Sequence, residues 1–125
     1  MYLIRLFKGV QILVFPEDGI YGFDYTRKGI ESYLEHIPNP AEETWTPCIE
    51  PGKYLNTEIQ RNLSCMASSN NMYIVANVGD YQSCDNKTDP KCPSDGHYQF
   101  NTNVVYSPNG TLIARYHKTH LFYEP

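Results

Sequence analysis

An unbroken apolar run that stops at a proline constrains this chain more than any other feature. Residues 12–15 are Ile-Leu-Val-Phe, and they predict a strand buried on both faces of a sheet. Pro16 has no N–H to donate to a sheet ladder, so the strand should end there. Glu17 follows, and the Asp-Gly pair after it predicts a turn. Because side chains just beyond a strand's carboxyl end often face a crevice in α/β folds, Glu17 is well placed for proton transfer.

The composition sets limits on the class of protein. A length of 125 residues fits one domain with its own core, and 41% hydrophobic and 19% charged residues argue against general disorder. The net charge of −4 and the lack of a basic run argue against a nucleic-acid partner. No apolar segment approaches the length needed to cross a bilayer.

Four cysteines indicate an oxidising compartment, since none of their spacings is Cys-x-x-Cys and a zinc site would need tighter pairs. They are Cys48, Cys65, Cys84 and Cys92. A disulfide could close the short polar loop between the last two, and Cys65 would then pair with Cys48. The sequence alone leaves all three pairings open.

Three N-glycosylation sequons begin at Asn62, Asn86 and Asn109. Asn86 and Asn109 fall in predicted loops, where a glycan could be attached, whereas Asn62 falls in a predicted helix and is discounted. The amino terminus does not match this secretory character. Residues 1–9 are amphipathic, as at the end of a helix that leads into the first strand, and make a poor signal peptide. The simplest resolution is an incomplete copy of a longer secreted protein.

Periodicity predicts two helices with a loop between them. Residues 26–37 carry apolar side chains three and four apart, and a proline follows them. Thr57 as N-cap and Gln60 at N3 form a capping box that begins a second helix, which ends at an Asn-Asn pair. The proline-rich segment 38–52 should be irregular and anchored by burial of Trp45.

Three further strands are predicted. Residues 72–78 form a second buried strand, closed by a Gly-Asp pair. Residues 99–106 and 111–117 are joined by Ser-Pro-Asn-Gly, whose proline and glycine positions indicate a type I turn. Lys118 follows the last strand, so that it stands at a strand end as Glu17 does.

Other polar residues are expected to be structural. The histidines, which are scattered and lack metal-ligand spacing, should be satisfied by their neighbours; they are His36, His97, His117 and His120. Asp18 and Asp80 are expected in turns, and no metal or cofactor is predicted.

The segments around Glu17 and Lys118 resemble two of the three signature segments of the carbon–nitrogen hydrolase (nitrilase) superfamily. The first is Phe-Pro-Glu-Asp followed by Gly-Ile-Tyr-Gly at residues 15–22, and the second is Arg-Tyr-His-Lys-Thr-His-Leu-Phe at 115–122. Further segments are similar to the vanin and biotinidase branch: residues 77–80, the cysteine loop with its Pro-x-Asp-Gly, and 98–102. Residues 37–40, 45–48 and 117–118 favour vanins, which are pantetheinases. The resemblance runs from Gly9 to the last residue.

This resemblance implies an α/β fold, an αββα sandwich of which residues 1–125 form an incomplete single domain, about half. Glu17 matches the family's general base, and Lys118 matches the lysine that stabilises the oxyanion and the thiolate. The nucleophilic cysteine lies in a further segment beyond this lysine, and no cysteine of the chain matches it, so we expect the chain alone to be inactive. The expected substrate of the complete protein is a small-molecule amide, pantetheine, hydrolysed outside the cell without a cofactor.

Two alternatives remain at this stage, biotinidase-like hydrolysis of biotin amides and a non-catalytic secreted glycoprotein. An incomplete sandwich should also leave one apolar sheet face uncovered, which favours self-association.

Overall fold

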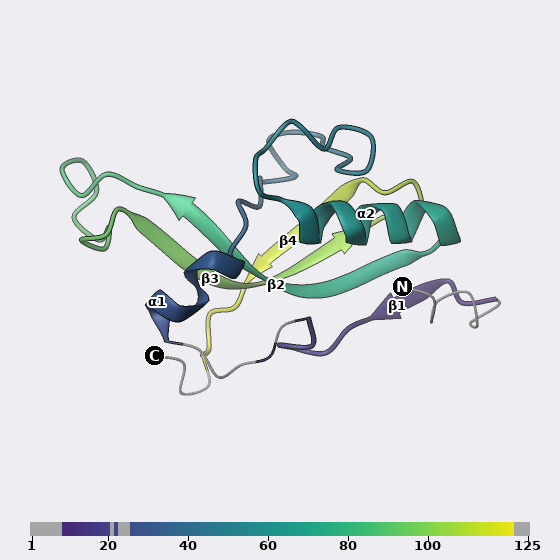
Figure 1. Cartoon of the computed structure of the whole chain (residues 1–125), viewed down its shortest axis with the longest axis horizontal. Coiled ribbons are helices and arrows are strands. Elements are labelled where there is room, and N and C mark those ends of the chain that lie inside the picture. The colour runs from purple at the N-terminus through teal and green to yellow at the C-terminus, as the bar shows by residue number, and fades with distance from the viewer. Residues whose placement is uncertain (1–8, 21, 23–25, 122–125) are drawn as a thin grey trace.

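A computed structural model describes residues 9–20, 22 and 26–121 of the chain, so the prediction for residues 1–9 lies almost wholly outside it. Within this part, four strands form one sheet in the order β1-β2-β3-β4 (Figure 1). The strands are β1 (Ile12–Val14), β2 (Tyr73–Ser83), β3 (His97–Tyr106) and β4 (Leu112–His117). β1 runs parallel to β2, and the other neighbours are antiparallel.

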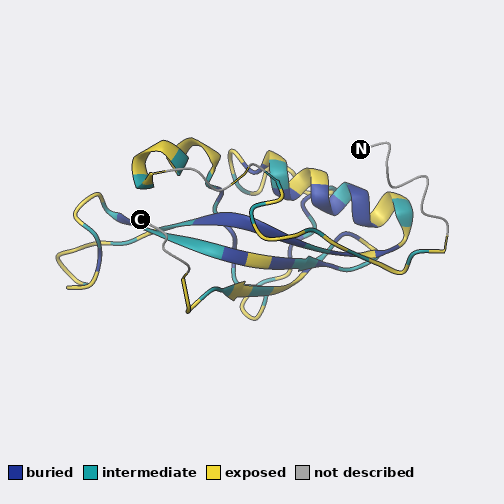
Figure 2. Ribbon diagram, turned by 90° about the horizontal axis from the view of Figure 1, so that it is seen from below, coloured by how far each residue is buried: buried dark blue, intermediate teal, exposed yellow. Residues whose placement is uncertain are grey.

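The core lies between the sheet and helix α2 (Glu58–Asn70), whose buried residues lie on the side that faces the strands (Figure 2). As the periodicity predicts, the helix buries an apolar stripe that includes Leu63, Met66 and Ala67. These side chains pack with Ile37 and with residues of three strands; the latter are Ile74, Ala76, Val78, Val104, Tyr106 and Leu112. The helix ends, as expected, at the Asn-Asn pair, where Asn71 adopts the left-handed conformation.

The sheet face opposite α2 is exposed at the first strand, so the expectation that this strand is buried on both sides is wrong. Ile12 and Val14 are 54% and 60% exposed, because they point away from α2, whereas Leu13 between them packs against the core. Residues paired across neighbouring strands point to the same face of a sheet. Tyr73 pairs with Ile12, and Tyr116 pairs with the outward-facing Asn103, so both tyrosines lie on this exposed face. No described helix or sheet packs on these apolar side chains, as expected for an incomplete sandwich.

The helix predicted over residues 26–37 is much shorter in the structure. Helix α1 (Arg27–Ile30) and the 3-10 turn η2 (Glu31–Tyr33) are followed by extended chain. Glu35 pairs with the second strand: its N–H donates to the Gly79 carbonyl, and its own carbonyl accepts from the Tyr81 N–H. Tertiary pairing therefore overrides the helical period, and Gly29 in the helix weakens it further.

The capping box predicted for α2 is also wrong. The Thr57 hydroxyl donates to the Tyr54 carbonyl instead of accepting from the helix. The cap comes from Glu35, whose carboxylate accepts from the N–H groups of Ile59 at 2.7 Å and Gln60 at 3.0 Å. Burial raises the pKa of Glu35, and the hydrogen bonds from the helix oppose that rise.

Asp80 is not a turn residue, because β2 continues through it to Ser83. Its fully buried carboxylate accepts from the Ile37 N–H at 3.0 Å and the Gln82 amide at 2.8 Å. The other oxygen lies 2.6 Å from Nε2 of His117. A buried carboxylate with these partners fixes the β2 and β4 ends together.

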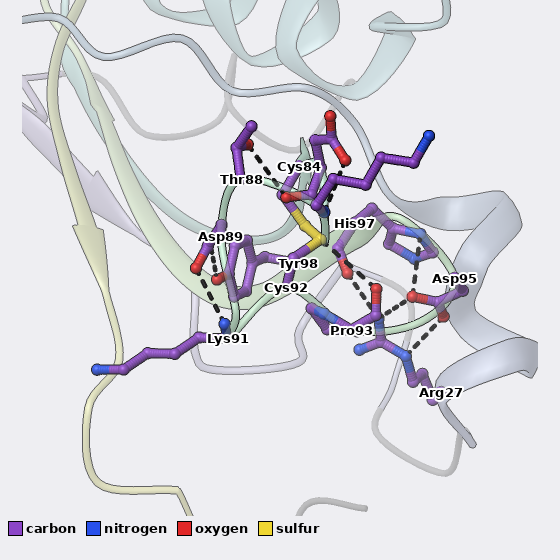
Figure 3. The surroundings of a disulfide bond; sticks show 12 residues. Arg27, Cys84, Thr88, Asp89, Lys91, Cys92, Pro93, Asp95, His97 and Tyr98 are labelled. Carbon is purple, nitrogen blue, oxygen red and sulfur yellow. Dashed lines mark hydrogen bonds and ion pairs between the residues drawn. A yellow bond between two sulfur atoms is a disulfide. The ribbon is translucent and has the colours of Figure 1, made fainter.

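His97 differs from the satisfied histidine that we expect. It is buried, and no described residue hydrogen-bonds its ring nitrogens. The ring stacks on Tyr81 at 4.3 Å between centroids, and Nδ1 lies 3.6 Å from the Asp95 carboxylate. Figure 3 shows Asp95 between this ring and the Arg27 guanidinium, which binds the carboxylate through two nitrogens at 2.8 and 2.9 Å.

Both disulfides are present in the pairing considered above, Cys48 with Cys65 and Cys84 with Cys92. The first ties the irregular segment 38–52 to α2, and Trp45 in that segment is buried as predicted. The second closes the loop between β2 and β3 (Figure 3).

The β3–β4 hairpin turn is confirmed by a hydrogen bond from the Gly110 N–H to the Ser107 carbonyl. Gly110 has φ +86°, and a Cβ there would lie 2.8 Å from the Ser64 hydroxyl of α2. A glycine is therefore required both by the turn and by the close approach of the helix.

Candidate active site

A tight turn presents Glu17 just beyond the first strand. The Phe15 N–H still donates to the Val75 carbonyl of β2 at 2.8 Å, and Pro16 then ends the pairing. The Gly19 N–H donates to the Pro16 carbonyl at 3.0 Å, and Asp18 adopts the left-handed region with φ 59°. Asp18 therefore lies in a turn as predicted, and the turn is short enough to keep Glu17 close to the sheet.

Lys118 reaches the same place from the other edge of the sheet. It follows β4, and its N–H donates to the Asn101 carbonyl of β3 at 2.8 Å. Its Nζ lies 2.5 Å from Oε1 of Glu17, although 101 positions separate the two residues in sequence. The two side chains predicted from the sequence are therefore in direct contact, with 46% of the Glu17 side chain and 26% of the Lys118 side chain exposed.

Asn101 completes this contact. Its Nδ2 donates to the same Glu17 oxygen, Oε1, at 2.8 Å. The hydrogen bond from Lys118, and after it the one from Asn101, lowers the pKa of Glu17 below its ordinary value. Glu17 is therefore ionised at neutral pH. Both of these donors reach the same carboxylate oxygen, Oε1.

His117 precedes Lys118 and holds the end of β4 from the opposite face. Its ring stacks on Phe100 at 3.8 Å between centroids, with the rings nearly parallel, and its Nε2 meets the buried Asp80 carboxylate. A histidine held in this way limits the directions in which Lys118 can leave the strand.

Sequence reasoning missed the asparagines beside the candidate site. Asn77 lies on β2, and Asn101 and Asn103 lie on β3, all on the sheet face opposite α2. A signal was present in the sequence, since residues 101 and 103 share one face of a predicted strand, and asparagine is depleted in strands.

The cysteines have no part in this constellation. All four of the chain's cysteines are joined in the two disulfides, and none is free. A disulfide sulfur is not a thiolate, so none of them is an available nucleophile.

Comparisons with known proteins identify the family to which this fold belongs. The carbon–nitrogen hydrolase family model matches residues 3–125, and the chain belongs to this family. A biotinidase from Takifugu rubripes is 52% identical over 118 residues, which are 94% of this chain and 23% of that protein. A pantetheinase from Bos taurus is 54% identical over 115 residues, which are 92% of this chain and 22% of that protein.

Among solved structures, an N-terminal amidase superposes with a TM-score of 0.57 at 18% sequence identity, over 90% of this chain and 20% of that one. At this level of identity the likeness concerns the fold, and it confirms the predicted incomplete α/β fold of the nitrilase type. The chain thus spans about a fifth of the length of these relatives.

Proposed function

We propose that residues 1–125 are part of one carbon–nitrogen hydrolase domain, and that the complete protein hydrolyses a small-molecule amide, pantetheine, to pantothenate and cysteamine. The observation that carries this proposal is the contact between Glu17 and Lys118. The pantetheinase from Bos taurus, 54% identical over the matched residues, supports the substrate class.

In this mechanism Glu17 is the general base. Its carboxylate takes the proton of a cysteine thiol, and the thiolate attacks the carbonyl carbon of the amide. The ammonium of Lys118 stabilises first the thiolate and then the negative oxygen of the tetrahedral intermediate. The C–N bond breaks as the leaving amine takes the proton from Glu17, and water then hydrolyses the thioester to the acid.

The nucleophile has to come from outside residues 1–125, because every cysteine within them is in a disulfide. The 125-residue chain alone should therefore hydrolyse nothing, since a base and a cation without a thiolate form no thioester. Pantetheine turnover by residues 1–125, above that of the Glu17→Gln variant, would contradict this proposal.

A chimera supplies the direct test of the two residues. Residues 9–121 replace the matching segment of the Bos taurus pantetheinase, and cysteamine release is measured. We expect Glu17→Gln and Lys118→Met each to reduce kcat by roughly 100-fold or more, as for loss of a general base or an oxyanion donor. Glu42→Gln, an exposed change in the loop, is the matched control. Full activity of the Glu17→Gln chimera would refute the assignment.

Biotin-amide hydrolysis is the second candidate, favoured by the 52% identity to the Takifugu rubripes biotinidase. The ratio of kcat/KM for pantetheine and for a biotin amide, measured on the same chimera, distinguishes the two substrates. Turnover of neither would favour the third alternative, a non-catalytic secreted glycoprotein.

We also propose that the protein passes through the secretory pathway and carries glycans at Asn86 and Asn109. Both are exposed in loops, and the Asn109 side chain accepts from the Thr111 N–H at 3.1 Å in a turn at the hairpin tip. Asn62 is exposed but helical, and a rigid helix is a poor acceptor conformation. Expression in a secretory cell with and without a glycosidase should show two mobility shifts, each removed by one Asn→Gln change.

Self-association of the isolated chain follows from the exposed sheet face that carries Ile12, Val14, Tyr73 and Tyr116. Sedimentation of residues 1–125 should show concentration-dependent association, and Val14→Lys should reduce it.

A further inference from the structure

Glu17 and Lys118 come from opposite edges of the sheet. The turn after β1 carries Glu17 and the chain after β4 carries Lys118, with β2 and β3 between those strands (Figure 1). Two asparagines occupy the intervening strands, Asn77 on β2 and Asn101 on β3. The side chains of these asparagines therefore lie where hydrogen bonds could link the two central strands to the Glu17–Lys118 ion pair.

The hydrogen bonds form an unbroken series that starts at the turn after β1, crosses β2 and β3, and returns to the same turn. The Asp18 N–H donates to Oδ1 of Asn77 at 3.0 Å. Nδ2 of Asn77 donates to Oδ1 of Asn101 at 2.5 Å, and Nδ2 of Asn101 donates to Oε1 of Glu17 at 2.8 Å. The series begins and ends on adjacent residues, so it clamps the turn to both central strands.

The direction of this series is fixed by its first member. A backbone N–H can only donate, so Asn77 must turn its amide oxygen toward Asp18 and its NH₂ group toward β3. Three acceptors wait there: Oδ1 of Asn101, and, at 3.3 Å each, the Thr102 carbonyl and Oδ1 of Asn103. Having accepted on its oxygen, Asn101 presents its NH₂ group to Glu17.

We propose that Asn77 and Asn101 are positioning residues of this site, forming a directed amide relay that orients the Glu17 carboxylate. This inference rests on the proposed role of Glu17 as general base. The relay does what Lys118 cannot do, because an ammonium on a four-carbon stem attracts a carboxylate without fixing its orientation. Asn77 is buried, so its amide is held by the sheet and not by solvent.

The relay requires asparagine at both positions. Asn101→Asp keeps the shape, but it replaces the donor to Glu17 by a second carboxylate, which repels it. Asn101→Ala removes the hydrogen bond from Asn77 and the hydrogen bond to Glu17. Asn62→Ala is the matched control, because it is the same kind of change at an exposed position of α2, which packs on the other face of the sheet.

Two measurements test the proposal. The first is the pKa of the Glu17 carboxyl, followed by carbon NMR in residues 1–125 against pH. The second is the pH profile of kcat/KM, with kcat and KM, in the chimera of residues 9–121 with the Bos taurus pantetheinase. Circular dichroism and Trp45 fluorescence report whether each variant is folded; if Asn101→Ala is not, Asn101→Ser makes the same comparison.

We expect Asn101→Ala to raise the pKa of Glu17 and to move the acid limb of the profile in the same direction. kcat should fall by roughly 10- to 100-fold with little change in KM, as for a misplaced catalytic group. Asn101→Asp should lower kcat further. Asn62→Ala should leave both measurements unchanged. A merely structural role would lower the folded fraction without moving the acid limb.

The relay is refuted if Asn101→Ala leaves the pKa of Glu17 at the value found with Asn62→Ala. A shifted pKa with unchanged kcat would refute the positioning role and leave the hydrogen bonds as structure only. Failure of the proposed function gives a different result, since Glu17→Gln would then retain kcat whatever the asparagines do.

Discussion

Glu35 should stabilise this fold, because its carboxylate caps the N-terminus of α2 although it lies more than twenty positions earlier in the sequence. Its carboxylate accepts from the Ile59 and Gln60 N–H groups at 2.7 and 3.0 Å, and from the Gln60 amide at 3.2 Å. Glu35→Ala leaves two helix donors without this acceptor, whereas the Gln60 amide keeps the His36 carbonyl at 2.8 Å. The change therefore tests a cap that no local sequence pattern contains.

The magnitude follows from these contacts. A buried donor left unsatisfied costs about 1–3 kcal/mol, so two donors cost roughly 2–6 kcal/mol. Removing the carboxylate also removes its desolvation, the cause of its raised pKa, and this offsets part of the loss. We expect a net decrease of about 2–4 kcal/mol in the free energy of unfolding, somewhat above an ordinary cap substitution.

Urea denaturation followed by far-UV circular dichroism and by the single tryptophan, the buried Trp45, measures this free energy. Glu58→Ala is the matched control: it removes the same charge from the first turn of the same helix at an exposed position. Its effect should stay below about 1 kcal/mol, the usual size of a charge–dipole interaction. Equal losses in the two variants would show that charge near the helix terminus, and not the cap, is responsible.

Three further predictions concern stability. Because the pKa of Glu35 is raised in the folded state, the folded state binds more protons than the unfolded state just above pH 4.5. The free energy of unfolding should therefore fall as pH rises from the ordinary pKa to the raised one. Measuring this free energy against pH should show the slope, and Glu35→Gln should remove it. Replacing Cys48 and Cys65 together by serine opens a loop with a sequence separation of 17 and should cost roughly 3 kcal/mol in the same urea experiment; no change in midpoint would contradict the constraint. Gly110→Ala should lower the thermal midpoint because of its positive φ and its contact with α2, whereas Gly52→Ala, with open space around it, should not.

Local chemistry explains what could be predicted from the sequence. Pro16 ends the first strand, and Ser-Pro-Asn-Gly makes the hairpin turn, because both act on their own backbone. The apolar stripe on α2 is confirmed, because the helical period of 3.6 residues puts the same residues on one face whichever element that face packs against. The contact between Glu17 and Lys118 was expected only through the family resemblance, and the structure brings the two side chains together.

The failures share a different cause. Glu35 lies within the segment predicted to be helical, yet it is extended because its backbone pairs with β2. Asp80 follows a glycine and looks like a turn residue, yet it is buried because His117 and the Ile37 N–H supply its partners. Each of these partners lies more than thirty positions away, beyond the reach of any pattern within a window.

The sequence by itself determined where the first strand ends, where the hairpin turns, which helix face is apolar, and which acid and which cation stand at strand ends. Tertiary structure decided the partners: the cap of α2, the carboxylate behind His117, and the asparagines that link Glu17 to the sheet. The physical reason is range, since propensity and turn chemistry act over a few residues of backbone. Burial and hydrogen bonding of charged groups depend on which distant strands the fold makes neighbours.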